Sequence, residues 1–173
     1  LSTIANRIET TSAVTRLRAW TAEAQRGDRA PVLRVNGAAG SLPAFLLYHL
    51  HREPGAPLCC LVPDEDAAAY LQSDLEQLLG DPDSGRDALL RVPATQKTPY
   101  APEQITDSTP LIERADALQR LAEGFDGILV TSVPAVGELV PPPQAVQRET
   151  LTVETGEEIS LEALADRLLE QDF

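Results

Sequence analysis

Short apolar runs alternate along the middle of the chain with stretches in which apolar residues recur every three or four positions. The apolar runs predict strands, which fall at 32–35, 58–62, 89–92 and 127–131. The periodic stretches predict helices, which fall at 42–51, 64–80 and 109–124. Alternating strands and helices imply right-handed crossovers and a parallel sheet flanked by helices, which is the α/β class. The run at 58–62 is typical of a strand buried on both faces.

The ends of two predicted helices carry clear signals. Asp64-Glu65-Asp66 places negative charge at a helix N-terminus, where the helix dipole favours it, and Gly80 ends that helix. Thr109-Pro110 opens the next helix, and Gly124 ends it. The apolar face of that helix is expected to comprise Ile112, Ala115, Leu118 and Leu121. Because adjacent acids on a helix do not face one another, we interpret the acidic triplet as a helix start rather than a metal site.

The sequence patterns at the two ends of the chain differ from the pattern in its middle. Spaced apolar positions through residues 2–26 predict a helical lead-in that ends near Gly27 and packs on the main domain. The stiff run Pro141-Pro142-Pro143 predicts a domain boundary. After it, residues 150–153 alternate like a strand, and Ser160 is placed to cap a helix. The predicted parts are a lead-in at 1–29, a main domain at 30–143 and the start of a second α+β domain at 144–173.

The turn between the first predicted strand and its helix has the layout of a phosphate-binding loop. It is made by Gly37, Gly40, Ser41, Leu42, Pro43 and Ala44. Leu42 stands where such a loop has a glycine, Pro43 where it has the lysine, and Ala44 where it has the magnesium-binding hydroxyl. The leucine side chain keeps the backbone from approaching a phosphate closely. The proline supplies neither an ammonium group nor an N–H, and the alanine supplies no metal ligand. We interpret the loop as a degenerate nucleotide site whose Ser41 caps the next helix; a turn that never bound phosphate is the simpler alternative.

The charge and the rare reactive residues restrict the possible functions. A net charge of −13 disfavours binding of DNA or RNA by this chain alone. Cys59 and Cys60 are adjacent and point to opposite faces of a strand, so we expect buried thiols, and His49 and His51 are expected at the surface. No metal site is predicted from these residues. Because the sequence has neither a membrane-length apolar run nor a secretory signal, a cytoplasmic location without membrane partners is expected.

Several segments, in order, resemble the N-terminal region of the bacterial transcription-repair coupling factor family. They are Thr98-Pro99-Tyr100 followed by 110–121, then 127–133 leading to Pro141-Pro142-Pro143, and finally 151–164. In that family this region is similar to the repair protein UvrB, and its phosphate loop is degraded, as it is here. The resemblance implies a P-loop-NTPase-like first UvrB-like domain and the opening of a second, UvrA-binding domain. UvrB itself is a weaker match, because residues 93–109 are too short and too poor in aromatics for its tyrosine-rich hairpin.

The resemblance implies a parent protein that uses ATP and Mg²⁺ to release stalled RNA polymerase and recruits UvrA for nucleotide excision repair. The motor and the polymerase-binding part would lie on other segments, and the UvrA contacts mostly beyond Phe173. No UvrA-contact residue is therefore assigned to this chain. We expect a bacterial cytoplasmic scaffold that makes contacts with other domains, with no catalytic residue, cofactor or metal of its own.

Two other interpretations stay open at this point. An α/β enzyme could bind a nucleotide or dinucleotide through backbone N–H groups at 37–41, with Asp64 as the candidate ribose partner. Alternatively, the chain could be a protein-interaction domain of another family. Binding of Mg-ATP or NAD distinguishes the enzyme from both non-catalytic interpretations.

Overall fold

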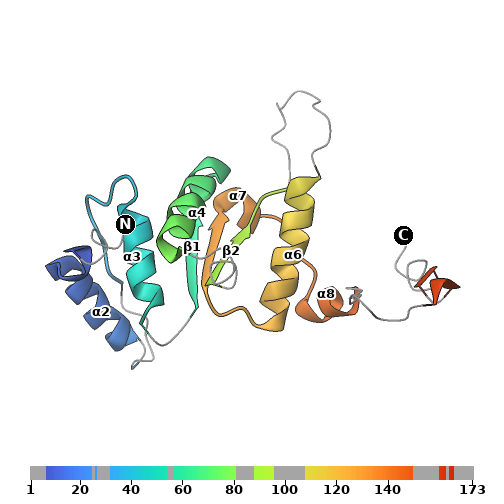
Figure 1. Cartoon of the computed structure of the whole chain (residues 1–173), viewed down its shortest axis with the longest axis horizontal. Helices are drawn as coiled ribbons and strands as arrows, with labels where there is room; N and C mark the ends of the chain where they lie inside the picture. The colour runs from blue at the N-terminus through green and yellow to red at the C-terminus, as the bar shows by residue number, and fades with distance from the viewer. Residues whose placement is uncertain are drawn as a thin grey trace.

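A computed structural model describes most of the chain. The residues described are 7–24, 26, 32–53, 57–80, 88–95, 108–149, 160–162 and 164–165. Their helices and strands are α2 (Ser12–Ala24), α3 (Leu42–His51), β1 (Leu58–Val62), α4 (Glu65–Leu79), β2 (Leu89–Val92), α6 (Thr109–Glu123), β3 (Ile128–Ser132), α7 (Val133–Val136) and α8 (Pro143–Glu149) (Figure 1). No helix among the described residues is both long and apolar enough to cross a membrane.

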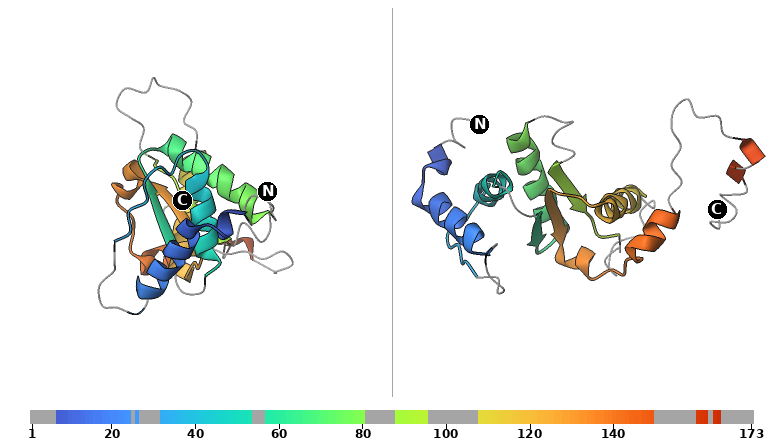
Figure 2. Two further views of the ribbon diagram at one scale, coloured as in Figure 1. Left: turned by 90° about the vertical axis from the view of Figure 1, so that its left-hand side faces the viewer. Right: turned by 90° about the horizontal axis from the view of Figure 1, so that it is seen from below.

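The three described strands form one parallel sheet in the order β1-β3-β2. Its register pairs Leu58 and Leu89 with Ile128 from the two sides of β3. Helices α4 and α6 lie on opposite sides of this sheet, as the view from below shows (Figure 2). The predicted α/β class with a helix-flanked parallel sheet is therefore confirmed.

Side-chain alternation along the strands produces two separate apolar clusters, one on each face. The cluster on the α4 side contains Ala44, Ala68, Leu75, Leu89, Ile128 and Val130. The cluster on the α6 side contains Leu90, Val92 and Ala117, with Leu121, Phe125 and Leu129 packed against it. Leu89 and Leu90 thus enter different clusters although they are neighbours in sequence, and the sheet is the central layer of the fold.

The helix ends are where the sequence predicts them. Asp64 precedes α4 and accepts a hydrogen bond from the Ala67 N–H at 2.8 Å, so it is the N-cap residue. Gly80 and Gly124 follow α4 and α6 with φ of 85° and 100°, a left-handed backbone that glycine adopts without a steric penalty. Helix α2 lies within the range predicted for the helical lead-in; it buries Val14 and packs against α3.

The strand predicted at 32–35 is not formed. Residues 32–36 are irregular, and 86% of the Val32 surface is exposed. The segment leads into α3, and α3 packs on α2 and α4 instead of lying beside the sheet. Residues 32–36 therefore form no ladder with any of the described strands.

Strand β1 is not buried on both faces, as its apolar run had predicted. Cys59 is exposed, and 55% of the Leu61 surface is exposed. The sheet order explains this result: α6 packs on β2, whereas β1 is at the opposite edge. The prediction of two buried thiols is therefore wrong for Cys59, while Cys60 is half-buried, and burial raises the pKa of its thiol.

Two further predictions about side-chain placement are wrong. Helix α6 buries Arg114 and Ala117, whereas Ile112 of the predicted apolar face is 66% exposed. His49 was expected at the surface but is 2% exposed on α3, because that helix is enclosed by packing against α2 and α4. The predicted strand at 150–153 lies outside the described residues.

Candidate functional site

The loop singled out by the sequence lies exposed in front of α3. Gly37 and Gly40 have φ of 77° and 59°, so both use the left-handed backbone that favours glycine. The prediction that Ser41 caps α3 is wrong, because its side chain makes no capping hydrogen bond. Residues 37–41 therefore form a turn shaped by glycine backbone geometry.

The start of α3 offers few backbone donors to an anion. The Leu42 N–H donates to the Ala39 carbonyl at 3.3 Å, and the Phe45 N–H donates to the Ser41 carbonyl at 3.3 Å. Pro43 has no N–H. An anion at a helix N-terminus is held by N–H groups without intrahelical partners, and three of the first four positions of α3 cannot supply one.

Ala44 occupies the position where a phosphate loop has its magnesium-binding hydroxyl, and it is fully buried at 0% exposure. It belongs to the apolar cluster on the α4 side of the sheet, together with Ala68 and Leu75. A hydroxyl at this position would lie in the core, away from any solvent-held ion. These residues therefore do not fit a magnesium–nucleotide group.

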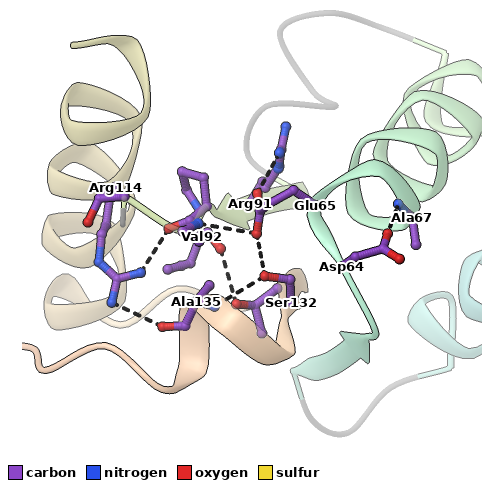
Figure 3. A network of polar contacts seen from close by, with 12 residues as sticks. Asp64, Glu65, Ala67, Arg91, Val92, Arg114, Ser132 and Ala135 are labelled. Atoms are coloured by element: carbon purple, nitrogen blue, oxygen red, sulfur yellow. Dashed lines mark hydrogen bonds and ion pairs between the residues drawn. The ribbon is translucent and has the colours of Figure 1, made fainter. Parts of the chain in front are cut away.

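The densest polar cluster lies at the carboxyl ends of the strands, where parallel α/β sheets commonly bind ligands (Figure 3). Glu65, directly after β1, accepts a short hydrogen bond from the Ser132 hydroxyl at the end of β3. Its other oxygen pairs with Arg91 of β2 at 2.8 Å. The Ala94 N–H donates to Glu65 at 3.2 Å. The Glu65 carboxylate thus links the start of α4 to β2, to β3 and to the segment after β2.

The electrostatics of Glu65 follow from these partners. Partial burial pushes the pKa of the Glu65 carboxyl upward, but the hydrogen bonds from Ser132, Arg91 and the Ala94 N–H together outweigh it. The pKa therefore lies below its usual value, and Glu65 is ionised at neutral pH. A carboxylate with a lowered pKa and every oxygen occupied is poorly suited to general acid–base catalysis.

A second carboxylate, that of Glu138, holds the segment that follows β2. Glu138 accepts hydrogen bonds from the Thr95 N–H and the Thr95 hydroxyl, both at 2.7 Å. The Arg114 Nε lies 3.5 Å from the same carboxylate, and the exposed fractions of the two side chains are 8% and 7%. Arg114 also donates to the Pro93 carbonyl at 2.8 Å and the Ala135 carbonyl at 3.2 Å. This buried pair joins α6, the segment after β2 and α7.

We call these residues the strand-end network: Glu65, Arg91, Thr95, Arg114, Ser132 and Glu138. Both of its carboxylates have a donor on each oxygen, and Ser132 additionally accepts the Ala135 N–H at 3.2 Å. Within the described residues, no group of three or more His, Cys, Asp or Glu side chains could hold a metal ion. The polar groups of the network are therefore occupied by contacts within the chain.

Sequence reasoning missed this network. It assigned Glu65 only to a helix start and did not single out Ser132, Arg91, Arg114 or Glu138. A usable signal was present, because the carboxyl ends of parallel strands meet at one edge, and polar residues stand at or just after each of these ends. Asp64, the candidate ribose partner, directs its carboxylate at the Ala67 N–H of its own helix.

Comparison with known proteins gives one line of similarity. No family model matches the chain, and no solved structure matches it. The chain is 33% identical over 157 residues to the transcription-repair-coupling factor of Myxococcus xanthus. The match covers 87% of this chain but only 12% of that protein, so the chain spans a small part of its relative's length.

Proposed function

Since this chain corresponds to a region of the transcription-repair coupling factors, we propose that it is a non-catalytic scaffold and interaction module within such a protein. The observation that carries the proposal is the strand-end network. Where an α/β enzyme would present side chains to a ligand, Glu65 and Glu138 are occupied by partners from their own chain. The polar edge of the sheet is thereby committed to structure.

The geometry around α3 supports the same proposal. Ala44, which is part of the core, stands where a phosphate loop has its magnesium-binding hydroxyl. Pro43 stands where the loop has its lysine, and it has neither a cationic group nor an N–H. In our proposal the loop at 37–44 is a degenerate form of a nucleotide-binding loop, and the domain around it resembles the first domain of UvrB. The fragment itself then needs neither ATP nor Mg²⁺.

The activities of the parent protein are also part of the proposal. The parent is an ATP-driven DNA translocase in the bacterial cytoplasm that releases stalled RNA polymerase at lesions and recruits UvrA for nucleotide excision repair. Those functions reside on other segments, and the UvrA contacts lie mostly beyond Phe173. The present region supports the UvrA-binding domain and makes contacts with other domains, without binding nucleic acid itself.

Isothermal titration calorimetry with Mg-ATP and, separately, with NAD tests the non-catalytic proposal. We expect no saturable heat from either ligand, because the start of α3 has few free backbone donors and no cation. Saturable binding of either would overturn the proposal and favour a nucleotide-binding α/β enzyme that uses the backbone at 37–41.

Restoring the motif side chains provides a second test. The double variant P43K/A44T should not hydrolyse ATP, and it should lose about 1–3 kcal/mol of unfolding free energy, because threonine overpacks the buried Ala44 position. The single variant P43K is the control and should keep nearly full stability. Steady-state ATPase above background in the double variant would contradict the account.

A further inference from the structure

The structure has an apolar groove on the side of α6 that faces away from the sheet. It lies between α6 and α8 and has a volume of about 490 Å³. Its apolar lining comes from Ile112, Ala115 and Leu118 of α6 and from Pro141 and Val146 of the chain around α8. Ile112, which the periodicity places on the core face, lines this groove instead, while α6 buries Arg114 and Ala117.

The groove continues into exposed apolar surface. Ile112 is 66% exposed, and Leu139, two residues before Pro141, is 100% exposed. Val140 is 52% exposed and joins Leu139 to the groove-lining Pro141. Exposed large apolar side chains on and near a groove are typical of an interaction site, because soluble domains usually cover extended apolar surface.

Among the side chains that the structure describes, the exposed charged ones on α6 have one sign. The exposed charged side chains of α6 are Glu113, Asp116 and Glu123, and Asp116 lines the groove itself. Arg114 is buried in the strand-end network, and Arg120 lies over the Phe125 ring at 5.4 Å. The groove therefore combines an apolar floor with an acidic side on a chain of net charge −13.

We propose that the groove between α6 and α8 binds an amphipathic helix of a partner protein, with an apolar stripe flanked by Lys or Arg. Apolar side chains of that helix would enter between Ile112 and Val146, and its basic residues would face Asp116 and Glu113. The proposal rests on the proposed function, since it gives the interaction module a surface and a partner chemistry. The two proposals can still fail separately, because binding of Mg-ATP would overturn the non-catalytic function without bearing on peptide binding in the groove.

Fluorescence anisotropy with model peptides tests the groove. The probe is a labelled helix of about 15 residues built from Leu and Lys. The comparison peptides are a Ser/Lys peptide of equal charge and a Leu/Glu peptide of opposite charge. We expect binding of the Leu/Lys peptide to be at least about tenfold tighter than that of either comparison peptide. Equal binding of the Leu/Lys and Ser/Lys peptides would overturn the proposal, because it would show attraction to net charge alone.

Matched variants locate the binding site. I112Q replaces an exposed apolar residue at the groove, and Y70Q replaces one on α4 that is 75% exposed. We expect I112Q to weaken Leu/Lys binding by about fivefold or more, and Y70Q to leave it unchanged. D116K should weaken binding in low salt and lose that effect at about 1 M salt, where charges are screened. Equal effects of I112Q and Y70Q would overturn the proposal, as would self-association of the chain that I112Q abolishes, since that would assign the groove to a second copy.

Discussion

The strand-end network and the loop in front of α3 differ in how they use their polar groups. In the network, Glu65 and Glu138 hold residues at the ends of β2 and β3 and in the segment after β2. In the loop, Gly37 and Gly40 shape an exposed turn, and the Ser41 side chain caps nothing. The sequence motif drew attention to the loop, whereas the polar contacts between different helices and strands are in the network.

The comparison shows that a motif resembling a binding site is not by itself evidence that a working site is present. The loop keeps the glycines of a nucleotide-binding turn, but the groups that would hold phosphate and magnesium are missing or buried. The strand-end network has the charged side chains of a site, but they are paired with one another. The two regions therefore predict unequal sensitivity to mutation.

The largest expected effect is at Arg114. R114M removes a buried guanidinium and leaves Glu138, at 7% exposure, without its cation and two carbonyls without a donor. Breaking a buried pair in this way is expected to cost about 3–5 kcal/mol of unfolding free energy. Urea unfolding measures the loss, and R16M on the exposed side of α2 serves as the control. A loss below about 1 kcal/mol would show that the pair contributes little.

Glu65 should give the chain a specific pH dependence. Its folded pKa lies below the ordinary value of 4.5, so its stabilisation is complete above that pH and is lost as the pH falls through the folded pKa. We expect the wild type to lose stability more steeply below about pH 4.5 than E65Q does. Thermal unfolding across this range checks the difference, with E113Q as an exposed control. Parallel pH profiles for wild type and E65Q would contradict the assigned role.

The smallest expected effects concern the residues that precede α4 and α3. D64A removes the side-chain cap of α4 and should cost about 1 kcal/mol, because the Ala67 N–H loses its acceptor. S41A should change stability by less than about 0.3 kcal/mol, since Ser41 makes no side-chain capping bond. Denaturant midpoints of the two variants suffice for this comparison. Equal losses would indicate that Ser41 caps α3 in solution.

Local signals predicted much of the fold. Asp64, Gly80 and Gly124 mark helix ends because capping and left-handed backbone depend on nearby residues, and they are where the sequence places them. Burial was harder to predict, because it depends on sheet order. Cys59 is exposed only because β1 is an edge strand, and this order cannot be derived from an apolar run.

The candidate site was less predictable than the fold. The pairing of Glu65 with Ser132 joins residues 67 positions apart, and Arg114 reaches across to Glu138. Neither contact follows from the spacing of residues along the chain. The turn at 37–44 could be singled out because its motif is local, and its interpretation as a degenerate nucleotide-binding loop stays a prediction.

A double-mutant cycle between Glu65 and Ser132 tests most directly whether the strand-end network is structural. The variants E65A, S132A and E65A/S132A are compared with the wild type by urea unfolding at neutral pH. We predict that each single variant is destabilised and that the two side chains are coupled by about 1–2 kcal/mol, as for a hydrogen bond to a partly exposed charged group. Zero coupling, with single variants as stable as the wild type or more so, would contradict the account. It would mean that these residues are held ready for a ligand at the expense of stability.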